Sequence, residues 1–289
     1  MAVEEVAFKD WRSALESLKQ WRERDERKSD QVLELGSRLI DRYSSKLGDE
    51  IWNVHEQLCI AALDCGDNET AQRSLGALAK QFPNSLRVKR LKGMSLEASG
   101  KYEEALELYA EMLKDHPTHS PVMKRKVAIH KAKGETTEAI KELNSLLEIY
   151  MCDLEAWLEL ADLYIQQNDY KKAAFCMEEL ILLNPNHHLY HQRYAEICYT
   201  QGTQGTLELA SKHYAMALKL NPDNMRALYG FCLVSSALGG GKKAKGEVKV
   251  RYGRYAEWAK AQLKQKYQFD NDQLRIVEKA LDLMTLPNR

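Results

Sequence analysis

The feature that most constrains this chain of 289 residues is a period of 34 residues. Four glycines keep this spacing, and an asparagine fills the one place where glycine is missing: Gly66, Gly100, Gly134, Asn168 and Gly202. Alanines keep the same spacing five residues further on: Ala71, Ala105, Ala139 and Ala173. A unit of this size cannot bury its apolar side chains alone, so we expect the copies to stack on one another.

The fullest copy covers residues 154–187. Its aromatic, small and proline residues are, in order, Trp157, Leu160, Ala161, Tyr164, Tyr170, Ala173 and Pro185. This order, together with the period, is that of the tetratricopeptide repeat, in which each copy is a pair of antiparallel helices. We therefore predict an all-α fold, a tetratricopeptide-repeat superhelical solenoid of antiparallel helix pairs.

Five copies are expected between residues 52 and 224. They cover residues 52–85, 86–119, 120–153, 154–187 and 188–224, and the fifth needs three extra residues in the turn between its helices. The flanking segments are predicted to be N-terminal helices forming a capping repeat (1–51), a degenerate sixth repeat (225–266) with a Gly/Lys-rich loop (239–250), and a C-terminal capping helix and tail (267–289).

Each recurring residue type has a physical reason. Small residues at the eighth and twentieth places let the two helices of a copy approach closely, and large apolar residues at i, i+3, i+4 and i+7 form the buried stripe. Glycine or asparagine between the helices accepts the left-handed conformation that ends the first helix. Proline after the second helix cannot continue it, so the chain turns into the next copy.

Composition excludes several classes of protein. Apolar residues make up 44 % and charged residues 29 %, as in folded soluble proteins, and the 42 basic side chains balance the 42 acidic ones, so net charge favours neither nucleic acid nor an anionic membrane. No run of eighteen apolar residues is present, and the N-terminus lacks the apolar core of a secretory signal. The six cysteines form no C-x-x-C pair, so we expect reduced thiols and a cytosolic protein.

Motifs that would indicate catalysis or a cofactor are incomplete. The stretch from His55 to Cys59 resembles a zinc-protease motif with cysteine in place of the second histidine, but Cys59 also fills the small eighth place of a repeat. His187, His188 and His191 have no acid nearby to complete a metal site. We therefore predict no catalytic residue, no cofactor and no metal.

The candidate site is the concave groove that the first helices of the repeats are expected to line. Their second, fifth, ninth and twelfth positions face this groove, and the predicted partner-binding residues are Arg87, Arg90, Lys124, Lys131, Glu155, Leu158, Asp162, Ile165, Leu189, Glu196 and Tyr199. The groove should change from basic to acidic and apolar along the chain. The alternative is an ordinary solvated face.

A second charged feature lies near the C-terminus. Residues 242–266 contain nine lysines or arginines against two acids, Glu247 and Glu257. Such a run is commonly only solvated, but it is also compatible with contact to anionic headgroups or RNA.

Several segments that the repeat itself does not require resemble subunit 2 of the endoplasmic reticulum membrane protein complex. They are residues 46–52 (KLGDEIW), 87–91 (RVKRL), 173–180 (AAFCMEEL), 184–190 and 224–228, and the likeness spans residues 11–284. The resemblance implies a non-catalytic scaffold on the cytoplasmic face of the endoplasmic reticulum membrane, peripheral and without a membrane span of its own. The complex inserts transmembrane proteins, tail-anchored ones included, and its second subunit binds cytosolic segments of membrane subunits and a small soluble subunit.

Two other functions remain open at the level of sequence. A free adaptor or co-chaperone would use the same groove, although the clamp that binds chaperone tails needs Asn where Ala128 follows Lys124. An RNA-associated helical-repeat scaffold would use the basic run at 242–266.

Overall fold

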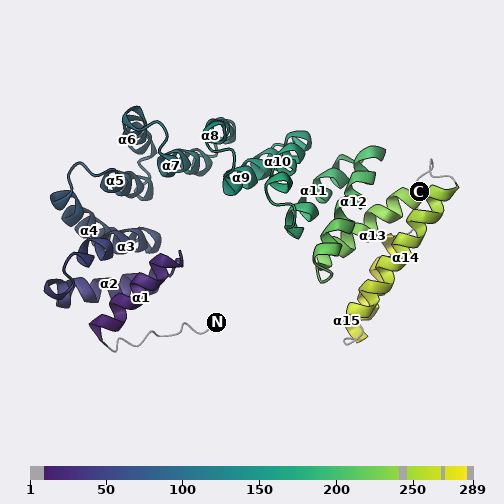
Figure 1. Ribbon diagram of the computed structural model, residues 1–289, viewed down its shortest axis with the longest axis horizontal. Coiled ribbons are helices and arrows are strands. Elements are labelled where there is room, and N and C mark those ends of the chain that lie inside the picture. Colours follow the sequence, from purple (N-terminus) through teal and green to yellow (C-terminus); the bar gives the residue numbers. More distant parts are fainter. Residues whose placement is uncertain (1–9, 241–245, 268–270, 285–289) are drawn as a thin grey trace. The chain divides into compact units, whose positions relative to one another are not determined.

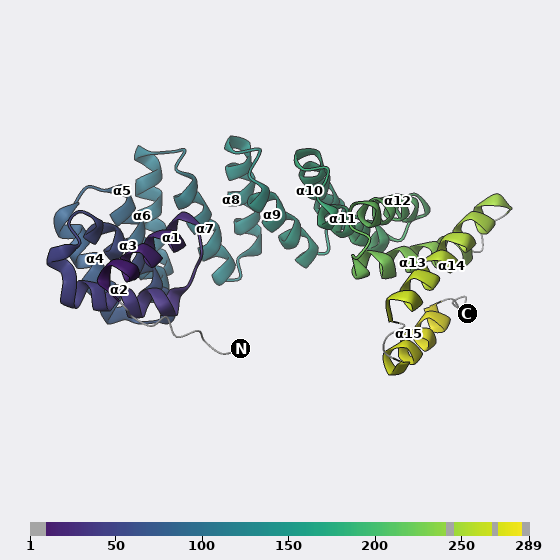
Figure 2. The same cartoon turned by 60° about the horizontal axis from the view of Figure 1, so that its bottom comes forward.

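The computed structural model describes residues 10–240, 246–267 and 271–284, which form fifteen α-helices, one short 3₁₀ helix and no strand (Figures 1 and 2). The all-α prediction is confirmed. The helices are α1 (Trp11–Glu23), α2 (Ser29–Tyr43), η1 (Ser44–Lys46), α3 (Glu50–Cys65), α4 (Asn68–Gln81), α5 (Leu86–Ala98), α6 (Tyr102–Asp115), α7 (Ser120–Ala132), α8 (Thr136–Ile149), α9 (Leu154–Gln166), α10 (Tyr170–Leu183), α11 (His188–Gln201), α12 (Gln204–Leu220), α13 (Met225–Gly240), α14 (Glu247–Tyr267) and α15 (Asn271–Met284).

The turn inside each helix pair has the backbone conformation that the period predicts. Gly66, Gly100, Gly134 and Gly202 have φ between 69° and 77°, and Asn168 has φ of 59°. These are left-handed values, which glycine adopts freely and asparagine tolerates better than most residues. The residue that follows often caps the second helix: the Asp169 carboxylate, for example, accepts a hydrogen bond from the backbone N–H of Lys172 at 3.2 Å.

The chain forms two compact units, residues 1–142 and 143–289, with the boundary inside α8. In the first unit, α1 to α3 share a core that includes the fully buried Leu18, Leu39 and Val54. In the second unit, Met177 and Leu180 are fully buried on α10. Within each unit the helices follow one another as antiparallel pairs (Figure 1).

The small residues of the repeat mark the closest helix contacts. Ala139 and Ala173 have no exposed surface. At Gly93 on α5, a Cβ atom would lie 2.3 Å from the ring of Tyr109 on α6, and at Gly230 on α13 it would lie 2.3 Å from the ring of Tyr214 on α12. Glycine at these two places therefore makes room for a buried tyrosine ring.

Two details differ from the predictions. The three extra residues of the fifth repeat do not lengthen the turn: they lengthen the second helix, because α12 has 17 residues whereas α10 has 14. An added turn of helix absorbs about 3.6 residues without disturbing the buried face. The capping box between Thr203 and Thr206 starts this longer helix.

Both ends of the predicted loop at 239–250 are helical. Gly239 and Gly240 belong to α13, and residues 247–250 belong to α14. The N–H of Val250 donates to the carbonyl of Gly246 at 3.3 Å, so helical hydrogen bonding has begun there. Lys242 and Lys243 of the predicted basic run lie outside the described residues.

The contact between Gly93 and Tyr109 gives a stability prediction. We expect Gly93→Ala to lower the free energy of unfolding by about 1–3 kcal/mol, because the added methyl group must displace a buried ring that also donates a hydrogen bond to Glu97 at 2.6 Å. Gly76→Ala on α4 is the control, because a Cβ atom there has no neighbour within 4 Å. This change should stabilise the helix by about 0.5–1 kcal/mol. Urea unfolding of both variants measures the difference, and equal effects would contradict the packing described here.

Candidate functional site

Carboxylates on the first helices of repeats are paired with arginines on the first helix of the next repeat. The pairs are Glu56 with Arg87 and Arg90, Glu97 with Arg125, Asp162 with Arg193, and Glu196 with Arg226. The partners are 28 to 34 residues apart, which is close to one repeat. Each pair therefore joins two first helices that lie side by side within one unit.

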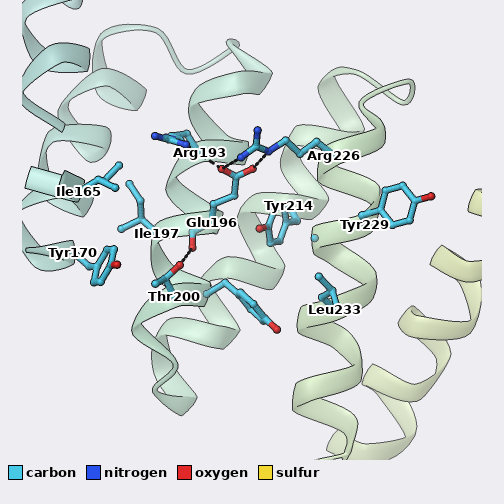
Figure 3. A pocket seen from close by; sticks show the side chains of 12 residues that line it. Ile165, Tyr170, Arg193, Glu196, Ile197, Thr200, Tyr214, Arg226, Tyr229 and Leu233 are labelled. Atoms are coloured by element: carbon cyan, nitrogen blue, oxygen red, sulfur yellow. Dashed lines mark hydrogen bonds and ion pairs between the residues drawn. The ribbon is translucent and has the colours of Figure 1, made fainter. Parts of the chain in front are cut away.

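The second unit contains a pocket of about 450 Å³ between its first helices (Figure 3). Its wall includes residues of α9 to α13: Ile165, Tyr170, Arg193, Glu196, Ile197, Tyr199, Thr200, Tyr214, Arg226, Tyr229, Gly230 and Leu233. Charged groups lie on one side of it, and tyrosine and aliphatic side chains form the rest. Such a mixed lining suits a polypeptide segment that carries both apolar and polar side chains.

Glu196 is the centre of the charged side of this pocket. Its carboxylate accepts hydrogen bonds from Arg226 Nε at 2.5 Å and Nη2 at 3.1 Å, a bidentate arrangement. Gln192 Nε2 donates to the same carboxylate at 2.9 Å, and Arg193 Nη1 lies 3.6 Å from it. Arg193 also donates to Asp162 at 3.0 Å. Figure 3 shows both arginines directed at Glu196.

Two tyrosines of this pocket, Tyr214 and Tyr229, remain neutral hydroxyl groups at physiological pH. Burial, followed by the charge of Glu196, raises the pKa of Tyr214, and burial raises the pKa of Tyr229, with a hydrogen bond to Tyr267 as the next cause. A neutral phenol offers an apolar ring and one polar tip, which suits a contact surface.

The first unit has its own pocket, of about 480 Å³, between the α1–α2 turn, α3 and α5. Its polar groups are largely paired with one another. Arg27 Nε donates to Asp64 at 2.7 Å and the Ser29 hydroxyl donates to the same carboxylate at 2.7 Å, and these bonds lower the pKa of Asp64, with that of Arg27 the largest cause. Glu56 holds Arg87 and Arg90 in the same way, with Arg87 Nε donating at 3.2 Å.

The predicted groove residues fall into separate groups. Arg87 and Arg90 line the pocket of the first unit, and Ile165, Glu196 and Tyr199 line that of the second. The other predicted residues line neither pocket and lie on first helices as follows: Lys124 and Lys131 on α7, Glu155, Leu158 and Asp162 on α9, and Leu189 on α11.

The prediction missed the partners of the charged residues. Three residues of the second pocket stand at other positions of the predicted repeats, and two lie on α13 in the sixth repeat, for which no groove residue was predicted: Arg193, Tyr170 and Tyr214, and Arg226 and Tyr229. One signal was available. An acid is followed by an arginine 31 residues later in Glu56 and Arg87 and in Asp162 and Arg193. This spacing is three residues less than the period, so the arginine lies on the first helix of the next repeat, about one helical turn closer to the start of its helix than the acid is to the start of its own.

Two of the three histidines considered as metal ligands are engaged in hydrogen bonds within the second unit, and the ring of the third, His187, stacks on that of Tyr190. His191 Nε2 donates to the carbonyl of Pro185 at 2.9 Å, so its Nδ1 accepts from Nδ1 of His213 at 3.0 Å. His188 lies 3.0 Å from the side-chain amide of Asn224. Among the described residues, no cluster of three or more His, Cys, Asp or Glu side chains is arranged to hold a metal ion.

Cys59 and His55, which resemble part of a zinc-protease motif, lie in the interior of the first unit. Burial raises the pKa of the Cys59 thiol to about 11, and its sulfur lies 3.7 Å from the carbonyl oxygen of Ala71. His55 is buried and stacks on Trp52.

No helix in the described ranges combines the length and the apolar character needed to cross a bilayer.

Several known proteins similar to this chain belong to one family. The family model described as the EMC2 TPR-like repeat domain matches residues 80–220. ER membrane protein complex subunit 2-A of Xenopus laevis is 49 % identical over 89 % of this chain and 87 % of its own length. ER membrane protein complex subunit 2 of Dictyostelium discoideum is 33 % identical over 97 % of this chain and 91 % of its own length.

Solved structures support the fold alone. The C-terminal part of a TPR repeat-containing protein from Cytophaga hutchinsonii is similar with a TM-score of 0.60, covering 93 % of this chain and 99 % of that one at 15 % identity. At this identity the likeness says that the helices stack as tetratricopeptide repeats, and it says nothing about partners.

The buried histidine pair gives a pH prediction. Burial, then the neighbouring His191, lowers the pKa of His213 from 6.5 to about 4. The unfolded chain therefore binds a proton near pH 6.5 that the folded chain binds only near pH 4, so stability should be lost as the pH falls through this window. Urea unfolding between neutral pH and about pH 4.5 measures this loss, which should be smaller in His213→Gln. Some loss should remain because burial also lowers the pKa of His55. Identical pH profiles for the two proteins would contradict the assignment.

Proposed function

The chain belongs to the family of subunit 2 of the endoplasmic reticulum membrane protein complex, a family of non-catalytic tetratricopeptide-repeat subunits, and we propose that it is a cytosolic scaffold of that complex. In this role it lies peripherally on the cytoplasmic face of the endoplasmic reticulum membrane. It supports the insertion of transmembrane proteins, tail-anchored ones included, by holding the cytosolic parts of other subunits. Its partners are cytosolic segments of membrane subunits and a small soluble subunit.

The observation that carries this proposal is that charged side chains on the first helices of each unit are already paired with one another. Their carboxylates are already bound by arginines of the same chain, as Glu196 is by Arg226. A partner therefore gains most by covering the apolar and aromatic residues between these pairs, such as Ile165 and Tyr199. Burial of such side chains in a preformed pocket is a typical way for one protein to hold a segment of another.

Charge adds selectivity to this binding. The pocket of the first unit carries six basic and four acidic side chains: Arg22, Arg27, Lys28, Arg87, Arg90 and Arg125 against Asp25, Glu26, Glu56 and Asp64. A partner segment with an excess of acidic residues fits this pocket. Because the excess charge of the pocket attracts acidic side chains, electrostatics would govern the rate of association and the choice of segment more than the final affinity.

A free adaptor or co-chaperone is the second candidate function. It would use the same pockets on soluble clients, and the open pockets by themselves do not favour one role over the other. The family relationship favours the membrane complex. The two roles differ in whether the chain copurifies with membrane proteins.

The pocket of the second unit can be tested by copurification. We expect Ile165→Glu combined with Tyr199→Glu to reduce the recovery of partner subunits at least tenfold, because each change places a charge where an apolar contact is proposed. The tagged chain is purified from cells in a mild detergent, and its partners are quantified by mass spectrometry.

The control carries the same two charges elsewhere in the same unit. Leu183 and Leu209 are each 39 % exposed, and neither lines the pocket. Leu183→Glu with Leu209→Glu should leave the partners bound, and circular dichroism establishes that both double variants are folded. Loss of partners in the control alone would show that a different surface is the contact. The absence of membrane subunits from the wild-type sample would favour the free adaptor.

Cell fractionation tests the location. We expect the chain to sediment with endoplasmic reticulum membranes, to be released by alkaline carbonate, and to be digested by protease added to intact microsomes. Release is expected because none of the described helices can span the bilayer. Retention after carbonate treatment, or protection from the protease, would contradict a peripheral position on the cytoplasmic face.

A further inference from the structure

One face of α14 is exposed and combines arginine with aromatic and aliphatic side chains. We call the five residues Val250, Arg251, Arg254, Tyr255 and Trp258 the basic–aromatic face of α14. Their spacings of one, three and four residues put them on one side of a helix, over about two turns. Val250 is 55 % exposed, Tyr255 41 % and Trp258 49 %, and together these three side chains form a contiguous exposed apolar patch on the face.

The opposite side of the same helix is used for packing. Tyr252, Ala256, Ala259 and Leu263 are buried and hold α14 in the second unit, beside α13 (Figures 1 and 2). The basic–aromatic face is therefore not needed to attach the helix.

Contacts with α13 hold the exposed rings in place. The ring of Phe231 lies 6.0 Å from that of Trp258, edge to face, and 5.8 Å from that of Tyr255. The Arg251 guanidinium lies 4.9 Å from the ring centre of Tyr252. A ligand for this face would meet side chains that are already ordered, so little conformational entropy would be lost on binding.

The arginines of this face form no ion pair. Within the described part of the chain, Arg251 and Arg254 have no carboxylate at ion-pair distance, although Glu247 lies one helical turn before Arg251, whereas the basic residues further along α14 are paired. Lys260 pairs with Glu257 at 3.0 Å and Lys264 with Glu278 at 3.0 Å. The arginines of both pockets described above are likewise paired. The start of α14 thus differs from the other basic surfaces in offering free cations.

We propose that the basic–aromatic face of α14 binds the surface of an anionic phospholipid bilayer. Arginine pairs well with phosphate, and tryptophan and tyrosine prefer the boundary between headgroups and acyl chains. Val250 adds an aliphatic side chain, which gains by burial at that boundary and has neither a ring to stack on a nucleic-acid base nor a group to hydrogen-bond to it. This combination on one side of a helix is typical of helices that lie in the membrane interface. The contact is separate from the partner pockets and does not depend on them.

The test uses the full-length chain and sedimentation with vesicles of phosphatidylcholine alone or mixed with phosphatidylserine. Binding is expected only to the mixed vesicles, and it should weaken as salt is added. Since one basic residue near such a surface changes partitioning about fivefold, Arg251→Gln with Arg254→Gln should reduce it about 30-fold. The matched control is Lys212→Gln with Lys219→Gln on α12, which removes the same charge from two exposed lysines of the same unit and should change binding less than about twofold.

A second measurement reports whether the aromatic part of the face enters the lipid. Brominated lipid should quench tryptophan fluorescence in the wild-type chain, and Trp258→Phe should remove most of this quenching because Trp258 is the tryptophan of the face. Circular dichroism and thermal unfolding establish that each variant is folded. Detergent copurification of partners by the Arg251/Arg254 variant should be unchanged, which separates this proposal from the one on partner binding.

Three results would overturn the proposal. The first is equal binding to neutral and anionic vesicles, and the second is an equal loss in the α12 control. The third is binding of the wild-type chain to polyuridylic acid but to no vesicle, lost in the Arg251/Arg254 variant, which would identify the face as a single-stranded RNA contact.

Discussion

The helix pairs of the repeats depend on a close approach that only small residues allow. Ala139 and Ala173 have no exposed surface, and Gly93 leaves the space that the Tyr109 ring fills. Without that approach the apolar stripes of neighbouring helices could not meet, and a pair of helices of 13 or 14 residues has too little apolar surface to be stable alone. The surfaces available for binding are what remains after these contacts are made.

The same packing determines what the charged residues do. Because first helices of adjacent repeats lie side by side within a unit, an acid on one reaches an arginine on the next, as Glu97 reaches Arg125 at 3.0 Å. Burial makes such a pair depend on both partners, since removing one leaves the other charge without compensation. These side chains therefore act first as links between repeats. When a partner binds, these charged residues exclude water and orient the partner, while the neighbouring apolar and aromatic residues provide affinity.

The two kinds of surface suit different contacts. The pockets are concave, with charges satisfied inside the protein, and they fit segments of other proteins. The basic–aromatic face of α14 lies on a single helix, and its arginines form no ion pair within the described chain. A scaffold that holds cytosolic parts of membrane proteins works close to a bilayer, where weak direct contact would add to the binding provided by its partners.

The sequence by itself determined the class of fold, the period, the left-handed turns at Gly66 and Gly202, and the family. These follow from local rules: glycine adopts positive φ freely, small residues allow close approach, and apolar side chains repeat with the helix. Only the tertiary structure decided which charges meet, which tyrosines line a pocket, and that the extra residues of the fifth repeat lengthen α12. The physical reason is distance along the chain. Arg226 finds Glu196 across 30 residues, and that choice depends on how far each first helix is rotated against the next, which no single repeat encodes.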